Sequence, residues 1–214
     1  MKKATLLLSL ALFMLSGCKW DRVSGSGATK IDKRSVPAFT SVDISGAYEV
    51  EIVAQKGQSV EIEGDDNLLP LIKTEVRDSV LEISNEKSIS TKNKLRVRIS
   101  VQQLDGIETS GASNIVVSNV KSDDFKIHSS GASELKVSGE AKSLSIDSSG
   151  AGAIDTKDLH AEKANVHSSG AATAEVYATE ELAATVSGGG IVGYYGNPKN
   201  VKEDKSGAGT IIKR

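Results

Sequence analysis

The sequence predicts an all-β fold, a solenoid in which one short coil of strand and turn stacks on the next. Apolar residues alternate with polar ones through the first half of the chain, which is the period of a half-buried strand. A Ser-Gly-Ala phrase recurs through the second half. Its glycines lie 20, 19, 20, 18 and 19 residues apart, at Gly111, Gly131, Gly150, Gly170, Gly188 and Gly207. A fixed period near 20 residues indicates coils that bury their inner faces only against their neighbours.

Residues 1–17 are predicted to be a lipoprotein signal peptide. Two lysines precede an apolar stretch of eleven residues, Ala4 to Met14, whereas a membrane-spanning helix needs about 20. The stretch ends in Leu15-Ser16-Gly17-Cys18, which resembles the lipobox of bacterial lipoproteins. We expect Cys18, the only cysteine, to carry lipid and to anchor the chain to a membrane. The alternative is an ordinary signal peptide with an incidental cysteine.

Residues 18–35 are predicted to be a flexible tether, because they are polar, contain Ser24-Gly25-Ser26-Gly27 and show no apolar periodicity. Lys19 follows the cysteine, and in Gram-negative lipoproteins a residue other than Asp at that position usually accompanies transport to the outer membrane. The sequence therefore predicts an envelope protein of the outer membrane, on either its periplasmic or its surface side.

Residues 36–103 are expected to form irregular N-terminal strands of a single domain that spans residues 36–214. Alternating pairs such as Val50 and Ile52 predict strands, and turn residues separate them. The apolar segment Leu68-Leu69-Pro70-Leu71-Ile72 interrupts the pattern. It suits a turn or short helix that covers an open end of the core.

Residues 104–214 are expected to form the regular coils. The positions four residues before and four residues after each corner glycine are mostly apolar, so they should point inward. Glycine is expected at the corners because it adopts positive φ without penalty. Only Glu203, in the last coil, places a charge at an inward position, which suits a terminal coil that blocks strand addition.

Charge and composition exclude several function classes. The net charge of −2 provides neither the basic field that nucleic acid requires nor an acidic tail. The repeated corner serines suit turn hydrogen bonds better than nucleophilic catalysis, because several near-copies cannot share one catalytic role. No metal site or cofactor site is predicted.

One outward row alternates acid and imidazole at the position three residues before each corner glycine. It contains Glu108, His128, Asp147 and His167. A metal or acid–base row is one interpretation, but the two histidines would lie two coils, about 9.6 Å, apart. Stacking of complementary charges between neighbouring coils is the favoured interpretation.

A second outward row is the best binding candidate. Tyr177 and Tyr195 each stand seven residues after a corner glycine, with Lys157 and Arg214 expected at the same register on either side. An exposed aromatic pair flanked by cations suits a sugar ring or an envelope protein as partner. The favoured alternative is an aromatic ladder that stiffens the last coils.

The alternating N-terminal strands, with Val42-Asp43-Ile44-Ser45-Gly46, and the Asn67-Leu68-Leu69-Pro70 segment resemble the head GIN domain family. The Leu95-Arg96-Val97 strand and the Ser-Gly-Ala corners share this resemblance. Members of that family are bacterial envelope proteins labelled as heads of auto-transporter adhesins. The resemblance implies a right-handed, single-stranded β-helix and supplies no catalytic residues.

The predicted function is therefore a non-catalytic envelope module for adhesion or binding. Two alternatives remain at the level of sequence: a polysaccharide-processing enzyme on a β-helix scaffold, and a structural spacer in the envelope. A deep groove with clustered carboxylates would favour the enzyme, and a flat aromatic or polar face would favour adhesion. The oligomeric state stays open, since solenoid ends can associate.

Overall fold

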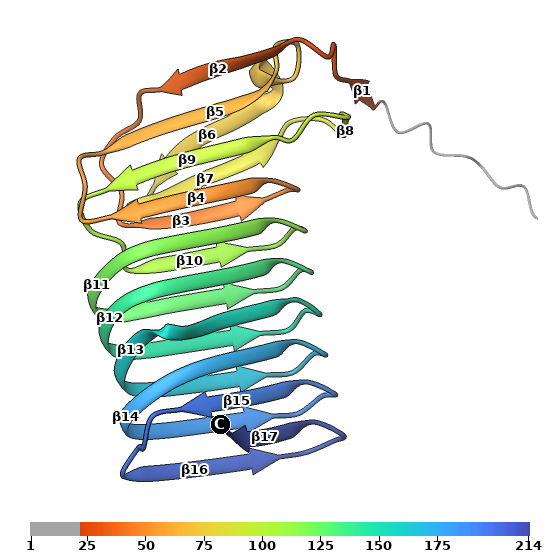
Figure 1. The fold of residues 1–214 in the computed structure, drawn as a ribbon. Helices are drawn as coiled ribbons and strands as arrows, with labels where there is room; N and C mark the ends of the chain where they lie inside the picture. The colour runs from red at the N-terminus through yellow and green to blue at the C-terminus, as the bar shows by residue number, and fades with distance from the viewer. Residues whose placement is uncertain (1–21) are drawn as a thin grey trace, which may run out of the picture.

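The protein is a stack of parallel coils, a β-solenoid of about 5 turns, in a computed structural model that describes residues 22–214 (Figure 1). The fold class predicted from the sequence is confirmed. Strands of successive coils pair in parallel, so each coil lies one strand spacing, about 4.8 Å, from the next. Within residues 22–214, no helix is long and apolar enough to cross a membrane.

The solenoid is built from ten strands, and the longest four each continue around a bend in the coil. They are β3 (Ser41–Ser45), β4 (Glu49–Ala54), β10 (Gly106–Thr109), β11 (Asn114–Ser129), β12 (Glu134–Ser148), β13 (Ala153–Ser168), β14 (Thr173–Val186), β15 (Ile191–Tyr195), β16 (Asn200–Lys205) and β17 (Thr210–Lys213). Each coil therefore has two turns, the Ser-Gly-Ala corner at one edge and the bend at the other (Figure 1).

The corners stack directly on one another through backbone hydrogen bonds. The Ala132 amide donates to the Gly111 carbonyl at 2.9 Å, and the same bond recurs from coil to coil. A Cβ on Gly131 would lie 2.0 Å from that carbonyl oxygen, so the stack requires glycine for close approach. Among the corner glycines, only Gly46 and Gly207 have positive φ, 156° and 119°. The reason for glycine predicted from the sequence is thus corrected.

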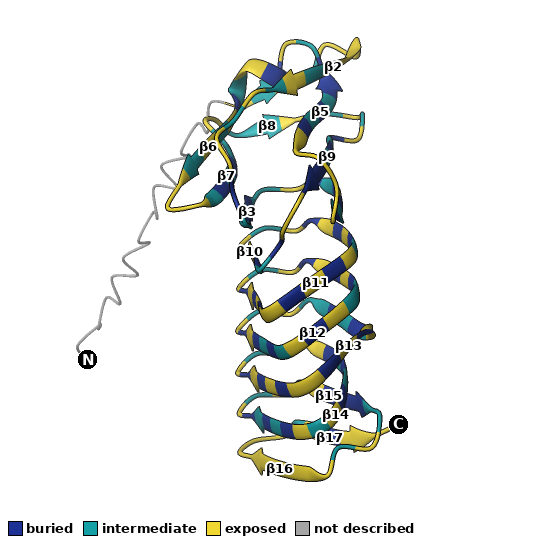
Figure 2. Ribbon diagram, turned by 90° about the vertical axis from the view of Figure 1, so that its left-hand side faces the viewer, coloured by how far each residue is buried: buried dark blue, intermediate teal, exposed yellow. Residues whose placement is uncertain are grey.

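The core is a column of buried apolar side chains from both halves of each coil. Figure 2 shows that buried positions alternate with exposed ones along the strands of the coils. The inward positions predicted from the corner glycines are buried: Ile107, Ile127, Ile146, Val166 and Ala184 before them, and Ile115, Leu135, Ile154, Ala174, Val192 and Ile211 after them. Glu203 pairs in register with Ala184, yet every residue of β16 is exposed. The last coil therefore leaves its outer edge uncovered.

The N-terminal end of the column is covered by shorter, mostly antiparallel elements. They are β1 (Val23–Ser24), β2 (Thr29–Arg34), β5 (Ser59–Asp65), η1 (Leu69–Leu71), β6 (Ile72–Arg77), β7 (Val80–Asn85), β8 (Ile89–Ser90) and β9 (Arg96–Val101). The apolar segment predicted to cover this end contains the 3₁₀ helix η1, and its Leu68, Leu69 and Ile72 are buried.

The predicted tether is corrected within residues 22–35, because Val23–Ser24 pairs with β8 in a two-stranded sheet and Thr29–Arg34 pairs with β5 in the large sheet. Strand β2 pairs antiparallel with β5, from Thr29 opposite Asp65 to Arg34 opposite Val60. Charged contacts support it: Lys33 pairs with Glu61 at 3.1 Å, and the Arg34 guanidinium donates to the Leu69 carbonyl at 2.8 Å. An edge strand held by its backbone and by charges has no apolar periodicity, which explains why the pattern predicted a linker.

Candidate binding surface

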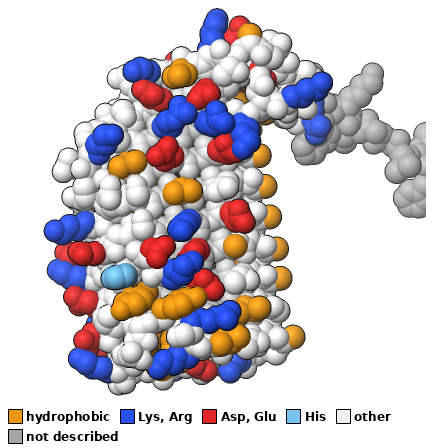
Figure 3. All heavy atoms as spheres, in the orientation of Figure 1, with side chains coloured by type: hydrophobic (Ala, Val, Ile, Leu, Met, Phe, Trp, Pro, Cys, Tyr) orange, Lys and Arg blue, Asp and Glu red, His pale blue; other side chains and the backbone are white. Residues whose placement is uncertain are grey.

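Three rings form a column on the outside of the C-terminal coils, beside the bend. His160 of β13 pairs in register with Tyr177 of β14, which pairs with Tyr195 of β15. The rings of His160 and Tyr177 stack with centroids 4.5 Å apart and planes 19° from parallel. His160 is exposed and both tyrosines are half-buried. We call these three residues the aromatic column; hydrophobic side chains gather over the C-terminal coils of this face in Figure 3.

The register predicted for Lys157 is corrected by a bulge in β13. Thr156 pairs with Val176, but the next pair is His160 with Tyr177, so Lys157 lies in the bulge. Its ammonium contacts Asp155 at 2.5 Å and Glu175 at 3.7 Å, and the bond to Asp155 raises the pKa of Lys157. The lysine is therefore held among carboxylates instead of flanking the tyrosines.

His160 is the residue that counting forward from the glycines misses. It stands ten residues before Gly170, as Glu140 stands before Gly150. Glu140 and His160 are indeed partners in the sheet. Counting backward from the following corners, however, aligns His160 with Ala178 instead of Tyr177, because a second irregularity lies between Ala161 and Lys163.

Arg214 lies beside the last ring, as the sequence predicted, although its side chain leans away from it. Its amide donates to the Tyr194 carbonyl at 2.9 Å, which places Arg214 next to Tyr195 in register. The guanidinium lies over Gly193: a Cβ built there would be 3.4 Å from Arg214 Nε. The cation thus covers the neighbouring stretch of β15.

The acid–imidazole row has the predicted register. Glu108 pairs with His128, His128 with Asp147, and Asp147 with His167. All four side chains are exposed. The structure extends the row toward the N-terminus, where Asp43 stands between Glu82 and Glu108. Burial, followed by repulsion from Glu108 and Glu82, raises the pKa of Asp43.

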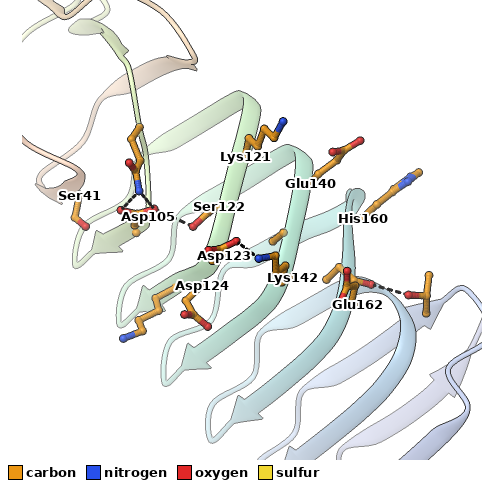
Figure 4. A pocket seen from close by; sticks show the side chains of 16 residues that line it. Ser41, Asp105, Lys121, Ser122, Asp123, Asp124, Glu140, Lys142, His160 and Glu162 are labelled. Atoms are coloured by element: carbon orange, nitrogen blue, oxygen red, sulfur yellow. Dashed lines mark hydrogen bonds and ion pairs between the residues drawn. The ribbon is translucent and has the colours of Figure 1, made fainter.

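A groove of about 910 Å³ runs along the bend next to the aromatic column (Figure 4). We call it the bend groove; it is lined by charged and hydroxyl side chains from successive coils, among them Asp105, Ser122, Asp123, Lys142, His160 and Glu162. Ser122 donates to Asp105 at 2.9 Å, and Lys142 pairs with Asp123 at 2.7 Å. His160 belongs to both features, so the column adjoins the groove through this residue.

Two carboxylates of the bend groove, Asp105 and Asp123, are partners in a hydrogen bond and an ion pair. Asp123 and Lys142 are 76% and 67% exposed, whereas a carboxyl that acts as general acid near neutral pH is usually tuned by burial. In residues 22–214, no group of three or more His, Cys, Asp or Glu side chains is placed to hold a metal ion. The groove suits recognition of a polar, hydroxyl-rich ligand.

Stacking determines which atoms of the aromatic column face solvent. Because His160 and Tyr177 stack face to face, their ring faces contact each other between neighbouring coils and their ring edges point outward. The column therefore offers phenol hydroxyls and an imidazole nitrogen, which donate and accept hydrogen bonds. Cys18, the predicted lipidation site, lies outside the described residues.

The comparison with protein families identifies the class. Residues 38–198 match the family described as "Putative auto-transporter adhesin, head GIN domain". This match covers most of the chain, so the protein belongs to that family. The resemblance noted in the sequence is thereby confirmed. No curated protein matches the chain.

Solved structures share the fold at low sequence identity. An adhesin-named protein from Bacteroides fragilis is 24% identical, with a TM-score of 0.73, over 90% of this chain and 100% of that one. An adhesin-named protein from Parabacteroides merdae is 21% identical, with a TM-score of 0.57, over 91% and 99%. A protein from Parabacteroides distasonis, named as lipid-binding, is 19% identical, with a TM-score of 0.57, over 90% and 99%.

Proposed function

We propose that the chain is a non-catalytic adhesion module that binds a glycan along the bend groove, with the aromatic column as its anchoring end. The observation that carries the proposal is that His160 lines the polar bend groove and also stacks on Tyr177, which pairs in register with Tyr195. A sugar chain offers hydroxyls both to the charged side chains of the groove and to the phenol and imidazole groups at the outward edges of the column. The adhesin names of the family and of its solved members support this class of function.

Glycan-panel binding tests the site. The double variant Tyr177→Ala, Tyr195→Ala should lose at least about tenfold in affinity, since aromatic anchors of a binding site commonly contribute more than 1.4 kcal/mol. Ile191→Ala, which truncates an exposed apolar residue of β15, is the matched control and should bind like the wild type. If the wild type and the double variant bound equally and the variant had a lower melting temperature, the aromatic column would be a structural ladder and the binding proposal would be refuted.

The phenylalanine variants separate two modes of contact. Tyr177→Phe, Tyr195→Phe keeps the ring stack and removes both hydroxyls. If the outward edges bind the glycan, this variant should lose affinity as well, whereas contact through ring faces would leave it unchanged.

We further propose that the chain is a lipoprotein anchored through Cys18 in the bacterial envelope. The support is the sequence Leu15-Ser16-Gly17-Cys18 and the absence of any other cysteine from the sequence. Mass spectrometry of the N-terminal peptide from protein made in a bacterium should find cleavage before Cys18 and a lipid mass on it. An unmodified Cys18 thiol would refute the anchor.

A further inference from the structure

Strand β1 brings the start of the described chain to one edge of the N-terminal end. Val23 pairs in parallel with Ile89 of β8, and its amide donates to the Ser88 carbonyl at 2.9 Å. The Gly25 amide continues the pairing with a bond of 2.8 Å to the Ser90 carbonyl. Arg22 therefore lies beside the segment that begins with Lys87.

A buried carboxylate fixes this arrangement. Asp65 is 1% exposed, and it accepts hydrogen bonds from the Gly27 amide at 3.2 Å, from Asn93 Nδ2 at 2.5 Å and from the Thr91 hydroxyl. One side chain thus ties the segment after β1 to the segment after β8. The point at which the chain joins the domain is held in place by the fold.

Basic side chains gather at this edge. Arg22, Lys87, Lys92 and Lys94 are all exposed, and we call them the basic end. In the part of the chain that the structure describes, no ion pair involves Arg22, Lys87 or Lys92, and Lys94 pairs with Glu49. Glu86, which precedes Lys87 in the sequence, is paired with Lys73 at 3.2 Å, and Asp21 precedes Arg22 in the sequence. Figure 3 shows Lys and Arg side chains, with Asp and Glu side chains among them, at this end of the visible face.

The covalent chain limits how far the basic end can lie from Cys18. Four residue steps separate Cys18 from Arg22, and an extended chain spans at most about 3.6 Å per residue, or about 14 Å in total. This is less than two Debye lengths at physiological ionic strength. The surface of a membrane in which Cys18 is anchored would therefore lie within the electrostatic range of the basic end.

We propose that the basic end binds the headgroups of anionic phospholipids and sets the orientation of the solenoid on the membrane. The inference rests on the proposed lipid anchor, and it identifies which surface of the protein faces the bilayer. Consecutive neighbours in the sheet are β9, β4, β11, β12, β13, β14 and β15. With a spacing of about 4.8 Å between strands, His160 of β13 lies about 19 Å and Tyr195 of β15 about 29 Å from the level of β9. The basic end thus directs the binding surface away from the bilayer.

Amine labelling of the lipidated protein on vesicles tests the proposal. The protein is reconstituted in phosphatidylcholine vesicles and in vesicles that also contain phosphatidylglycerol, and each lysine is followed by peptide mass spectrometry. Lys87 and Lys92 should react about fivefold more slowly on the anionic vesicles, the factor that corresponds to one basic contact with such a surface. High ionic strength should remove the difference, and Lys126 and Lys202 should react equally on both vesicles.

Charge-reversal variants supply the matched comparison. Lys87→Glu, Lys92→Glu should abolish the slower labelling of Lys94 on anionic vesicles, whereas Lys126→Glu, Lys202→Glu should preserve it. If Lys87 and Lys92 of an anchored protein were labelled equally on both kinds of vesicle, the proposal that the basic end binds anionic headgroups would be refuted. If the protein did not remain on neutral vesicles, the proposed lipid anchor would instead be refuted. Slower labelling of Lys87 and Lys92 on anionic vesicles would then still support the binding of anionic headgroups by the basic end.

Discussion

Buried hydroxyls inside the corners differ in how well they are paired. The Ser133 hydroxyl lies 2.9 Å from Thr109 Oγ1 and accepts from the Ser113 amide at 3.1 Å. The hydroxyls of Ser148 and Ser168 are equally buried and have no partner among the described residues. The structure explains the difference, because Ala172 and Gly190 occupy the positions in the following coils that correspond to Ser133.

We expect Ser133→Ala to destabilise the protein by about 1–3 kcal/mol, because the Thr109 hydroxyl and the Ser113 amide would lose a partner inside the core. Ser168→Ala, with the same 1% exposure as Ser133, should change stability by less than about 0.5 kcal/mol or increase it. Urea unfolding of both variants measures the contrast. Equal losses would show that hydroxyl pairing does not decide corner stability.

Asp43 gives stability a predictable pH dependence. Burial and the neighbouring Glu108 and Glu82 raise its pKa in the folded protein above the ordinary 3.8, so folding favours the protonated form. This favourable contribution is present below the unfolded pKa and is lost as pH rises through the folded pKa. Asp43→Asn should therefore be more stable than the wild type at pH 7, by a margin that shrinks towards pH 3.

The control for this prediction is Asp147→Asn, which removes an exposed acid of the same row. Unfolding free energies at both pH values are the measurement. A gain at Asp43 that is the same at acid and neutral pH would contradict an electrostatic cause.

At the scale of a single element, the Ser-Gly-Ala corner depends on the space that a Cβ would occupy. Gly131 would place it 2.0 Å from a backbone oxygen, whereas Gly189 has no atom within 4 Å of that position. Gly131 is the middle residue of its corner phrase, whereas Gly189 follows the corner glycine Gly188 and stands where Ala132 stands in the earlier corner. The pair therefore compares a crowded position of the corner with an open one.

Gly131→Ala should destabilise the solenoid by about 3 kcal/mol, because the corners would have to separate and lose backbone hydrogen bonds. Gly189→Ala should be neutral or stabilising by up to about 1 kcal/mol, since it restricts only the unfolded chain. Thermal unfolding of the two variants distinguishes close approach from a general need for glycine. Similar losses in both would argue against close approach.

Strands that bury one face were predictable, and elements held by charge or by the backbone alone were not. Val50 and Ile52 identify β4 because alternate side chains enter the core. In β2 the only large apolar residue, Ile31, is 57% exposed. The pairing of β2 with β5 therefore produces no alternation of apolar and polar residues in the sequence. The bulge that moves Lys157 out of the row is likewise set by packing inside the bend, where Leu159 is fully buried.

The site was predictable only in part for the same reason. Tyr177 and Tyr195 lie after corners of well-defined register, and their pairing follows from the count. The positions of His160 and of the bend groove depend on how many residues the bend absorbs in each coil. Counting forward from the glycines does not supply this number. Asp65, which fixes the basic end, binds partners 26 to 38 residues away in the sequence.

For the whole molecule, the two ends of the core column are unlike. The N-terminal end lies beneath β2, β5 and η1, whereas β16 is exposed along its length and pairs only with β14. The inward residues also become smaller towards the C-terminus, from Ile127 to Ala184. Because each coil contacts only its neighbours, these differences remain local.

Hydrogen exchange should therefore be graded along the stack. Amides of β11, β12 and β13 should exchange most slowly, and those of β16 and β17 several orders of magnitude faster, through opening of the last coil. Exchange followed by mass spectrometry gives this profile directly. Uniform protection from β11 to β17 would indicate one cooperative unit, or a last coil covered in solution.

The bend tolerates unequal coil lengths, whereas the corners do not. The coil from Gly150 to Gly170 has 20 residues and the next has 18, yet the register of both is restored before the following corner. Lys157 lies in the bulge between Thr156 and His160, which adds residues to this coil, and the next coil regains one between Ala178 and Glu181. The solenoid can thus serve as a display scaffold, in which a foreign peptide inserted after Lys157 would be carried on the outside of a stack whose corners keep their spacing.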